Sequence, residues 1–168
     1  LVDEVEGTRA TIVDTRKTVP LLRSLQKHAV VAGGGRNHRM GLHDQVLIKD
    51  NHIQAVGSAA EAVGRARRHL AERYGGEGIA VEVEIESVAD LEPVIEAGAD
   101  VVLLDNMAPG EMRRAVEIAG GRVLLEASGG ITLETARAVA ESGVDLISVG
   151  WLTHSAPALD VALEFEPA

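Results

Sequence analysis

Short apolar runs rich in β-branched residues alternate along the chain with longer amphipathic stretches. The apolar runs predict strands, and the stretches in which apolar residues recur every three or four positions predict helices. Strands are expected at residues 11–14, 29–33, 46–50, 79–86, 101–105, 122–128 and 146–150. Helices are expected near residues 19–27, 58–73, 88–97, 109–119 and 133–142. This alternation of strand and helix predicts an α/β protein with a parallel sheet.

Several helix boundaries carry local signals. Pro20 and Pro109 stand where first-turn prolines are expected, and Thr132 precedes a helix that it can cap. Gly98 and Gly143 follow helix ends, where glycine readily adopts positive φ. Residues 95–105 and 140–150 also resemble each other as a helix end, a glycine turn, an acidic residue and a strand. This repeat favours a closed or nearly closed β/α barrel, and no G-x-G-x-x-G motif supports a dinucleotide-binding sheet.

The composition limits the possible functions. The 168 residues fit one domain, taken here as 1–168, and 46% hydrophobic with 2% aromatic residues predicts an aliphatic core. A net charge of −10 argues against a nucleic-acid partner. The sequence has no apolar run of about 18 residues, so no membrane span is predicted. Without cysteine, disulfides and thiolate sites are excluded, which fits a reducing compartment. We therefore expect a cytoplasmic protein.

Cationic side chains are concentrated in residues 33–52, which begin with the glycine triplet 33–35. Glycine backbones can aim N–H groups into a concavity, and Arg36, Arg39 and Lys49 add positive charge around it. This segment is typical of an anion-binding loop, although a glycine triplet alone is equally typical of a mobile loop.

Polar and charged residues recur at the carboxyl ends of the expected strands, which meet on one face of a barrel. The basic ones suit planar carboxylates, Glu84 and Asp105 suit a hard cation or sugar hydroxyls, and the glycine turns suit a phosphate. The sequence contains no H-x-x-H spacing, so a zinc site is not expected. Ser128 does not lie in a G-x-S-x-G motif, so it is not expected to act as a nucleophile. The residues at these ends are Asp14, Arg16, Lys17, Lys49, Asp50, Glu84, Glu86, Asp105, Asn106, Glu126, Ser128, Gly150 and His154.

Seven motifs, in order along nearly the whole chain, resemble those of the quinolinate phosphoribosyltransferases, the carboxylating nicotinate-nucleotide pyrophosphorylases of NAD biosynthesis. They are Asp14-Thr-Arg-Lys-Thr, Gly33-Gly-Gly-Arg-Asn-His-Arg-Met-Gly-Leu, Val46-Leu-Ile-Lys-Asp-Asn-His, Val81-Glu-Val-Glu, Leu103-Leu-Asp-Asn-Met, Leu125-Glu-Ala-Ser-Gly-Gly-Ile and Ser148-Val-Gly-Trp-Leu-Thr-His-Ser. The resemblance implies an incomplete, seven-stranded β/α barrel. It also implies that quinolinate and phosphoribosyl pyrophosphate react, with Mg²⁺ as cofactor, to nicotinate mononucleotide, pyrophosphate and CO₂.

The resemblance further assigns roles to residues. Arg16, His38, Arg39 and Lys49 are expected to hold the quinolinate carboxylates, with Lys17 near the pyrophosphate-bearing substrate. Lys17, Lys49, Glu84 and Asp105 are expected to act in catalysis as charge stabilisers, and Glu84 and Asp105 also as Mg²⁺ ligands. The remaining substrate-binding residues implied by the motifs are Thr15 and, around the 5′-phosphate, Ser128, Gly129, Gly130, Val149, Gly150, Trp151 and His154.

Full-length members of this family carry an additional N-terminal domain that completes a neighbouring subunit's site with an arginine. Since that domain is missing here, we expect this chain to be a C-terminal fragment, and catalysis by the fragment alone is doubtful. The full-length enzyme is expected to be a homodimer or higher homo-oligomer. Two alternatives stay open: a molybdenum-locus paralogue with another substrate, and a non-catalytic barrel that binds phosphate or dimerises. The pair Glu84 and Asp105 favours an enzyme, because a phosphate-binding module has no use for it.

Overall fold

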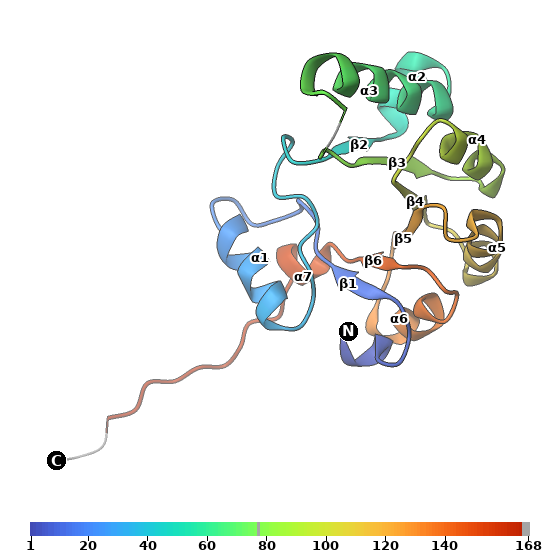
Figure 1. Ribbon diagram of the computed structural model, residues 1–168. Coiled ribbons are helices and arrows are strands. Elements are labelled where there is room, and N and C mark those ends of the chain that lie inside the picture. Colours follow the sequence, from blue (N-terminus) through green and yellow to red (C-terminus); the bar gives the residue numbers. More distant parts are fainter. Residues whose placement is uncertain (77, 166–168) are drawn as a thin grey trace.

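The computed structural model describes residues 1–76 and 78–165. The strands among these residues form a single curved, all-parallel sheet (Figure 1). Within these residues six strands are hydrogen-bonded in the order β1-β6-β5-β4-β3-β2. The strands are β1 (Thr11–Val13), β2 (Val46–Ile48), β3 (Val81–Ile85), β4 (Val101–Asp105), β5 (Leu124–Ser128) and β6 (Leu146–Ser148). The α/β class and the incomplete barrel are therefore confirmed, whereas the expected number of seven strands is wrong.

The helices lie around the outside of the curved sheet, and residues 155–165 extend away from it (Figure 1). No helix among the described residues is long and apolar enough to cross a membrane. The α-helices are α1 (Arg23–Ala32), α2 (Asp50–Val56), α3 (Ala59–Tyr74), α4 (Leu91–Glu96), α5 (Pro109–Ala119), α6 (Leu133–Ala140) and α7 (Trp151–His154). Two 3₁₀ turns, η1 (Asp3–Val5) and η2 (Val88–Asp90), complete the elements of the described chain.

The prediction of a strand at residues 29–33 was wrong and accounts for the difference in strand number. These residues form the end of α1 and its cap. The run Ala29-Val-Val-Ala is short and apolar, and such runs fit a buried strand and a helix equally well. Where a seventh strand would lie, the chain makes only an isolated parallel bridge between Val13 and Arg36. The segment after the glycine triplet thus occupies the gap between β1 and β2 without forming a strand.

Boundary signals were more dependable than the strand count. Pro109 begins α5, Thr132 precedes α6 with its N–H donated to Thr135, and Gly98 follows α4 with φ of 95°, as predicted. Pro20 does not begin a helix, because α1 starts only at Arg23 after a left-handed residue, Leu21, with φ of 67°. The short helices α2 and α7 were not predicted, since one or two turns give too little periodicity to recognise.

The barrel core is aliphatic, as expected, but a charged pair is enclosed in it. Lys27 of α1 and Asp14 at the end of β1 form an ion pair, and both side chains are 0% exposed. The Lys27 Nζ also donates to the carbonyl oxygen of His38 at 3.0 Å, and Asp14 accepts from the His38 N–H at 2.9 Å. One buried pair therefore fixes both backbone groups of a residue in the gap between β1 and β2.

Replacing Lys27 by Met should lower the free energy of unfolding by about 3–5 kcal/mol, because an unpaired Asp14 carboxylate is left in the core. Chemical denaturation measures this loss. Arg65→Met, which breaks the exposed pair with Glu61, is the control and should cost less than about 1 kcal/mol. The double variant Asp14→Asn/Lys27→Met should recover part of the stability, and a loss in Lys27→Met as small as in the control would contradict this role.

Candidate functional site

Two adjoining cavities open at the carboxyl ends of the strands, and every residue to which the family resemblance assigns a role lines at least one of them. The basic cavity, about 290 Å³, is lined among others by Arg16, Lys17, His38, Arg39 and Lys49. The turn cavity, about 560 Å³, is lined among others by Glu84, Asp105, Ser128, Gly129, Gly130, Val149, Gly150, Trp151 and His154. Residues shared by both are Thr15, Lys17, Lys49, Ser128 and Ser148.

The loops that carry the basic residues are held together by Arg23 at the start of α1. Its guanidinium donates to the carbonyl oxygens of Arg16 at 3.0 Å and Met40 at 3.3 Å. A further bond, from the Thr153 hydroxyl to the Lys17 carbonyl oxygen at 2.7 Å, ties the same loop to α7. Arg23 was not singled out from the sequence, where an arginine in an amphipathic helix reads as a solvent-exposed residue.

Positive charge in the basic cavity is only partly offset by the protein. The Arg16 Nε is buried and has no hydrogen-bond partner within the described residues. Burial and the neighbouring Arg16 lower the pKa of Arg39, although Glu82 and Asp44 act in the opposite direction. A buried N–H donor without a partner is costly, so the cavity is suited to an anion that supplies the missing acceptor.

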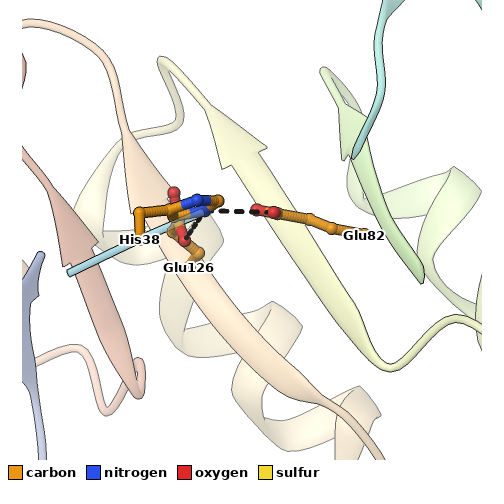
Figure 2. Close-up of side chains that lie close together, drawn as sticks. All are labelled: His38, Glu82 and Glu126. Carbon is orange, nitrogen blue, oxygen red and sulfur yellow. Dashed lines mark ion pairs between the residues drawn. The ribbon is translucent and has the colours of Figure 1, made fainter. Parts of the chain in front are cut away.

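His38, which lines the basic cavity, lies between the buried carboxylates of Glu82 and Glu126 (Figure 2). Its Nε2 is 3.1 Å from Glu82 Oε2 of β3 and 3.2 Å from Glu126 Oε2 of β5. The two glutamates are 0% and 1% exposed. Gln45 donates to Glu82 at 2.7 Å, and the Arg39 N–H donates to His38 Nδ1 at 2.7 Å. Both nitrogens of the His38 ring thus have protein partners.

The surroundings of His38 and Glu82 favour the protonated form of each. Burial lowers the pKa of His38, but the hydrogen bonds to Glu126 and Glu82 together with the negative charges of both carboxylates outweigh it and raise that pKa to about 10. Burial and the charge of Glu126 raise the pKa of Glu82. Because Nδ1 accepts the Arg39 N–H, the geometry favours a ring proton on Nε2, which faces both carboxylates.

The same donors lie close enough together to consider a metal ion. A histidine that binds a metal through Nε2 normally donates its Nδ1 proton to an acceptor. Here Nδ1 accepts the Arg39 N–H, which leaves the ring proton on Nε2. We therefore interpret His38, Glu82 and Glu126 as a hydrogen-bonded cluster and not as a metal centre.

In the turn cavity, two acidic residues face the space beside the glycine turns. Glu84 forms an ion pair with Lys49, and Asp105 accepts from the Asn106 amide at 2.9 Å. Mg²⁺ prefers carboxylate oxygens and is usually bound by one or two of them together with substrate phosphates. The donor set of Glu84 and Asp105 therefore fits the expected cofactor.

The glycine turns leave backbone groups accessible at the ends of β5 and β6. Gly129 and Gly130 have φ of 98° and 58°, values that favour glycine. A Cβ on Gly150 would lie 3.3 Å from both His154 Nε2 and Lys17 Cδ. The indole N–H of Trp151 donates to the Ile131 carbonyl oxygen at 2.9 Å and joins the two turns. This arrangement suits a phosphate, as the sequence predicted.

Other candidates from the sequence have structural roles or lie elsewhere. Arg36 and Glu86 do not line either cavity, and His52 accepts the Lys49 N–H at 3.0 Å at the start of α2. The glycine triplet caps α1 and turns the chain toward the bridge at Arg36, so it shapes the loop. Glu82 was missed, because one acidic residue inside an apolar strand gives no signal of its partner.

Comparison with known proteins agrees with this geometry. The family described as "Quinolinate phosphoribosyl transferase, C-terminal domain" matches residues 1–164. The probable carboxylating nicotinate-nucleotide pyrophosphorylase of Bacillus subtilis is 48% identical over 160 residues, which cover 95% of this chain and 54% of that protein. The Mycobacterium leprae enzyme is 46% identical over 166 residues, with 97% and 56% covered.

Solved structures give the same result. NadC from Streptococcus pyogenes superposes with a TM-score of 0.87 at 42% identity, covering 95% of this chain and 54% of that one. The nicotinate-nucleotide pyrophosphorylase from Francisella tularensis gives a TM-score of 0.87 at 43% identity, with 95% and 55% covered. The chain thus spans about half the length of the relatives it matches. It belongs to the quinolinate phosphoribosyl transferase family and corresponds to the C-terminal domain of that family.

Proposed function

We propose that this chain provides the barrel of an enzyme that transfers the phosphoribosyl group of phosphoribosyl pyrophosphate to quinolinate with decarboxylation. The products are nicotinate mononucleotide, pyrophosphate and CO₂. The observation that carries the proposal is the unpartnered Arg16 Nε in a cavity that also contains Arg39 and Lys49. Two adjacent carboxylates on a pyridine ring supply planar acceptors for these cations, including the one that the Arg16 Nε lacks. The relatives' names support the same substrate class.

The two adjoining cavities suggest how the substrates meet. Quinolinate would lie in the basic cavity, and the 5′-phosphate would bind the turns at Ser128–Gly130 and Gly150. Lys17 and Lys49 line both cavities, so they lie where the pyridine nitrogen would approach C1 of the ribose. Holding these two atoms in line is the main catalytic task, because it replaces an encounter in solution with a preorganised approach.

Charge stabilisation is the second task. As pyrophosphate leaves, the lysines offset its negative charge, and Glu84 and Asp105 face the oxocarbenium-like ribose. Mg²⁺, held by Glu84 and Asp105, would neutralise part of the pyrophosphate charge. After the ring nitrogen has been alkylated, the positively charged ring stabilises the electron pair of the C–C bond as CO₂ leaves, and the ring carbon then takes a proton from water. No protein nucleophile is required, so the site residues bind and stabilise charge.

The buried cluster adjoins the proposed quinolinate position, because His38 and Glu126 line the basic cavity. The raised pKa values of His38 and Glu82 favour their protonated forms, which reduces the repulsion that negative charge here would exert on quinolinate. Both ring nitrogens of His38 are engaged by the protein, so we assign it a supporting role and assign the carboxylate contacts to Arg16, Arg39 and Lys49.

The remaining expectations form part of the same proposal. The relatives are about twice as long as this chain, and complete activity would involve the additional domain and its arginine from a neighbouring subunit. A homodimer or higher homo-oligomer and a cytoplasmic location remain predictions.

Arg39→Ala and His154→Ala should have opposite effects on the two substrates, because Arg39 lines only the basic cavity and His154 only the turn cavity. Arg39→Ala should weaken quinolinate binding about 10- to 100-fold, as for loss of a charge-assisted hydrogen bond, and change phosphoribosyl pyrophosphate binding little. His154→Ala should do the reverse. Calorimetric titration of each variant measures both affinities, with exposed Arg113→Ala as the control. Equal losses for both ligands in both variants would contradict the separation of the two cavities.

The cluster also predicts a pH dependence of stability. The folded state binds more protons than the unfolded chain, since the pKa of His38 rises from 6.5 to about 10, so this stabilisation is complete below about pH 6.5. It is lost as the pH rises to 10, by at most about 1.4 kcal/mol per pH unit. Glu126→Gln, which removes one carboxylate, should flatten the fall in unfolding free energy between pH 7 and 10. Urea denaturation across this range tests it against exposed Glu117→Gln, and parallel curves for the two variants would refute the part of Glu126 in raising the pKa of His38.

A further inference from the structure

Asn106 follows β4 directly and has an unusual backbone. Its φ is 53°, and among the described residues Leu21 is the only other non-glycine residue with positive φ. Asparagine tolerates the left-handed region better than most residues, but backbone strain of this kind still has to be held by neighbouring contacts. Asn106 lines the turn cavity between the predicted acidic residue and the predicted phosphate-binding turn.

Two hydrogen bonds fix Asn106 in this conformation. Its backbone N–H donates to the Ser128 carbonyl oxygen at 2.9 Å, which joins the ends of β4 and β5. Its side-chain Nδ2 donates to Asp105 Oδ2 at 2.9 Å. The amide therefore restricts the rotation of the Asp105 carboxylate, which the backbone alone leaves free to turn.

The other side of the amide lies against Gly129. A Cβ placed on Gly129 would lie 2.2 Å from Asn106 Oδ1 and 2.5 Å from its Cγ. Gly129 also has φ of 98°, so a side chain at this position is opposed by both the backbone and the amide. Contact with the Asn106 amide thus helps to define the turn at Ser128–Gly130.

We propose that Asn106 is a positioning residue that orients Asp105 and fixes the Ser128–Gly130 turn relative to it. This inference rests on the proposed function, in which Asp105 faces the ribose and the turn binds the 5′-phosphate. A single amide then links the groups that contact two parts of the same substrate, the ribose and the 5′-phosphate of phosphoribosyl pyrophosphate. If Asn106 served only the left-handed turn, Gly or Asp would replace it without loss, since both accept this conformation.

Asn106→Asp separates these roles, because it keeps the size and the backbone tolerance but loses the N–H donor and adds a charge beside Asp105. Calorimetry should show about tenfold or greater weakening of phosphoribosyl pyrophosphate binding and a smaller change for quinolinate. Asn106→Gly should also weaken it while lowering Tm little. Asn51→Asp, the same exchange at an exposed site in α2, should leave both affinities unchanged.

The outcomes distinguish this inference from the proposed function. Binding by the wild type together with unchanged binding by Asn106→Asp would overturn the positioning role alone. Failure of the wild type to bind phosphoribosyl pyrophosphate would count against the proposed function and therefore against the substrate role of Asn106.

A ligand-free test addresses the contact with Gly129. Gly129→Ala should lower Tm by several degrees, because its Cβ meets the amide and the φ is unfavourable. In an Asn106→Gly background the same exchange should lower Tm less, since only the backbone strain remains. Strictly additive shifts in Tm would refute the contact by which Asn106 fixes the turn.

Discussion

The buried pair of Lys27 and Asp14 is the interaction on which the site depends, because it holds the chain where the barrel is incomplete. Within the described residues the sheet ends at β1 and β2, and the segment after the glycine triplet is joined to β1 only by the bridge of Val13 and Arg36. Without a strand ladder, this segment needs other acceptors and donors. The pair supplies both to the backbone of His38, and so it fixes the residue from which Arg39 enters the cavity.

The charge distribution around His38 follows from this placement. Cations line the basic cavity together with His38 and Glu126, and Glu82 is buried within salt-bridge distance of His38. Burial and the nearby charge of Glu126 raise the pKa of Glu82, which favours its protonated form. The cavity thus contains the unpartnered Arg16 Nε, in a chain whose overall charge is −10.

The face of the barrel that carries the candidate site could be predicted from the sequence. The carboxyl ends of parallel strands meet on one side whatever the exact number of strands. Periodicity could not show whether the four apolar residues 29–32 form a helix or a strand, since so short a run fits both. The contribution of Glu82 and Lys27 was also out of reach. Their partners, His38 and Asp14, lie in other parts of the chain, and only packing in three dimensions shows that each pair comes together. The predicted roles of individual residues come from the family resemblance and stay predictions.

Asn106 and Gly129 illustrate why residues in the turn cavity constrain each other. Asn106 adopts a strained backbone conformation because its N–H is held by Ser128, and that conformation places its amide where a side chain on Gly129 would lie. A change at either position alters the space of the other, although 22 intervening positions separate them in the chain. Lys17 and Lys49 line both this cavity and the basic one. A change in either lysine would therefore alter both cavities, and the alignment of the two proposed substrates would depend on residues that the cavities share.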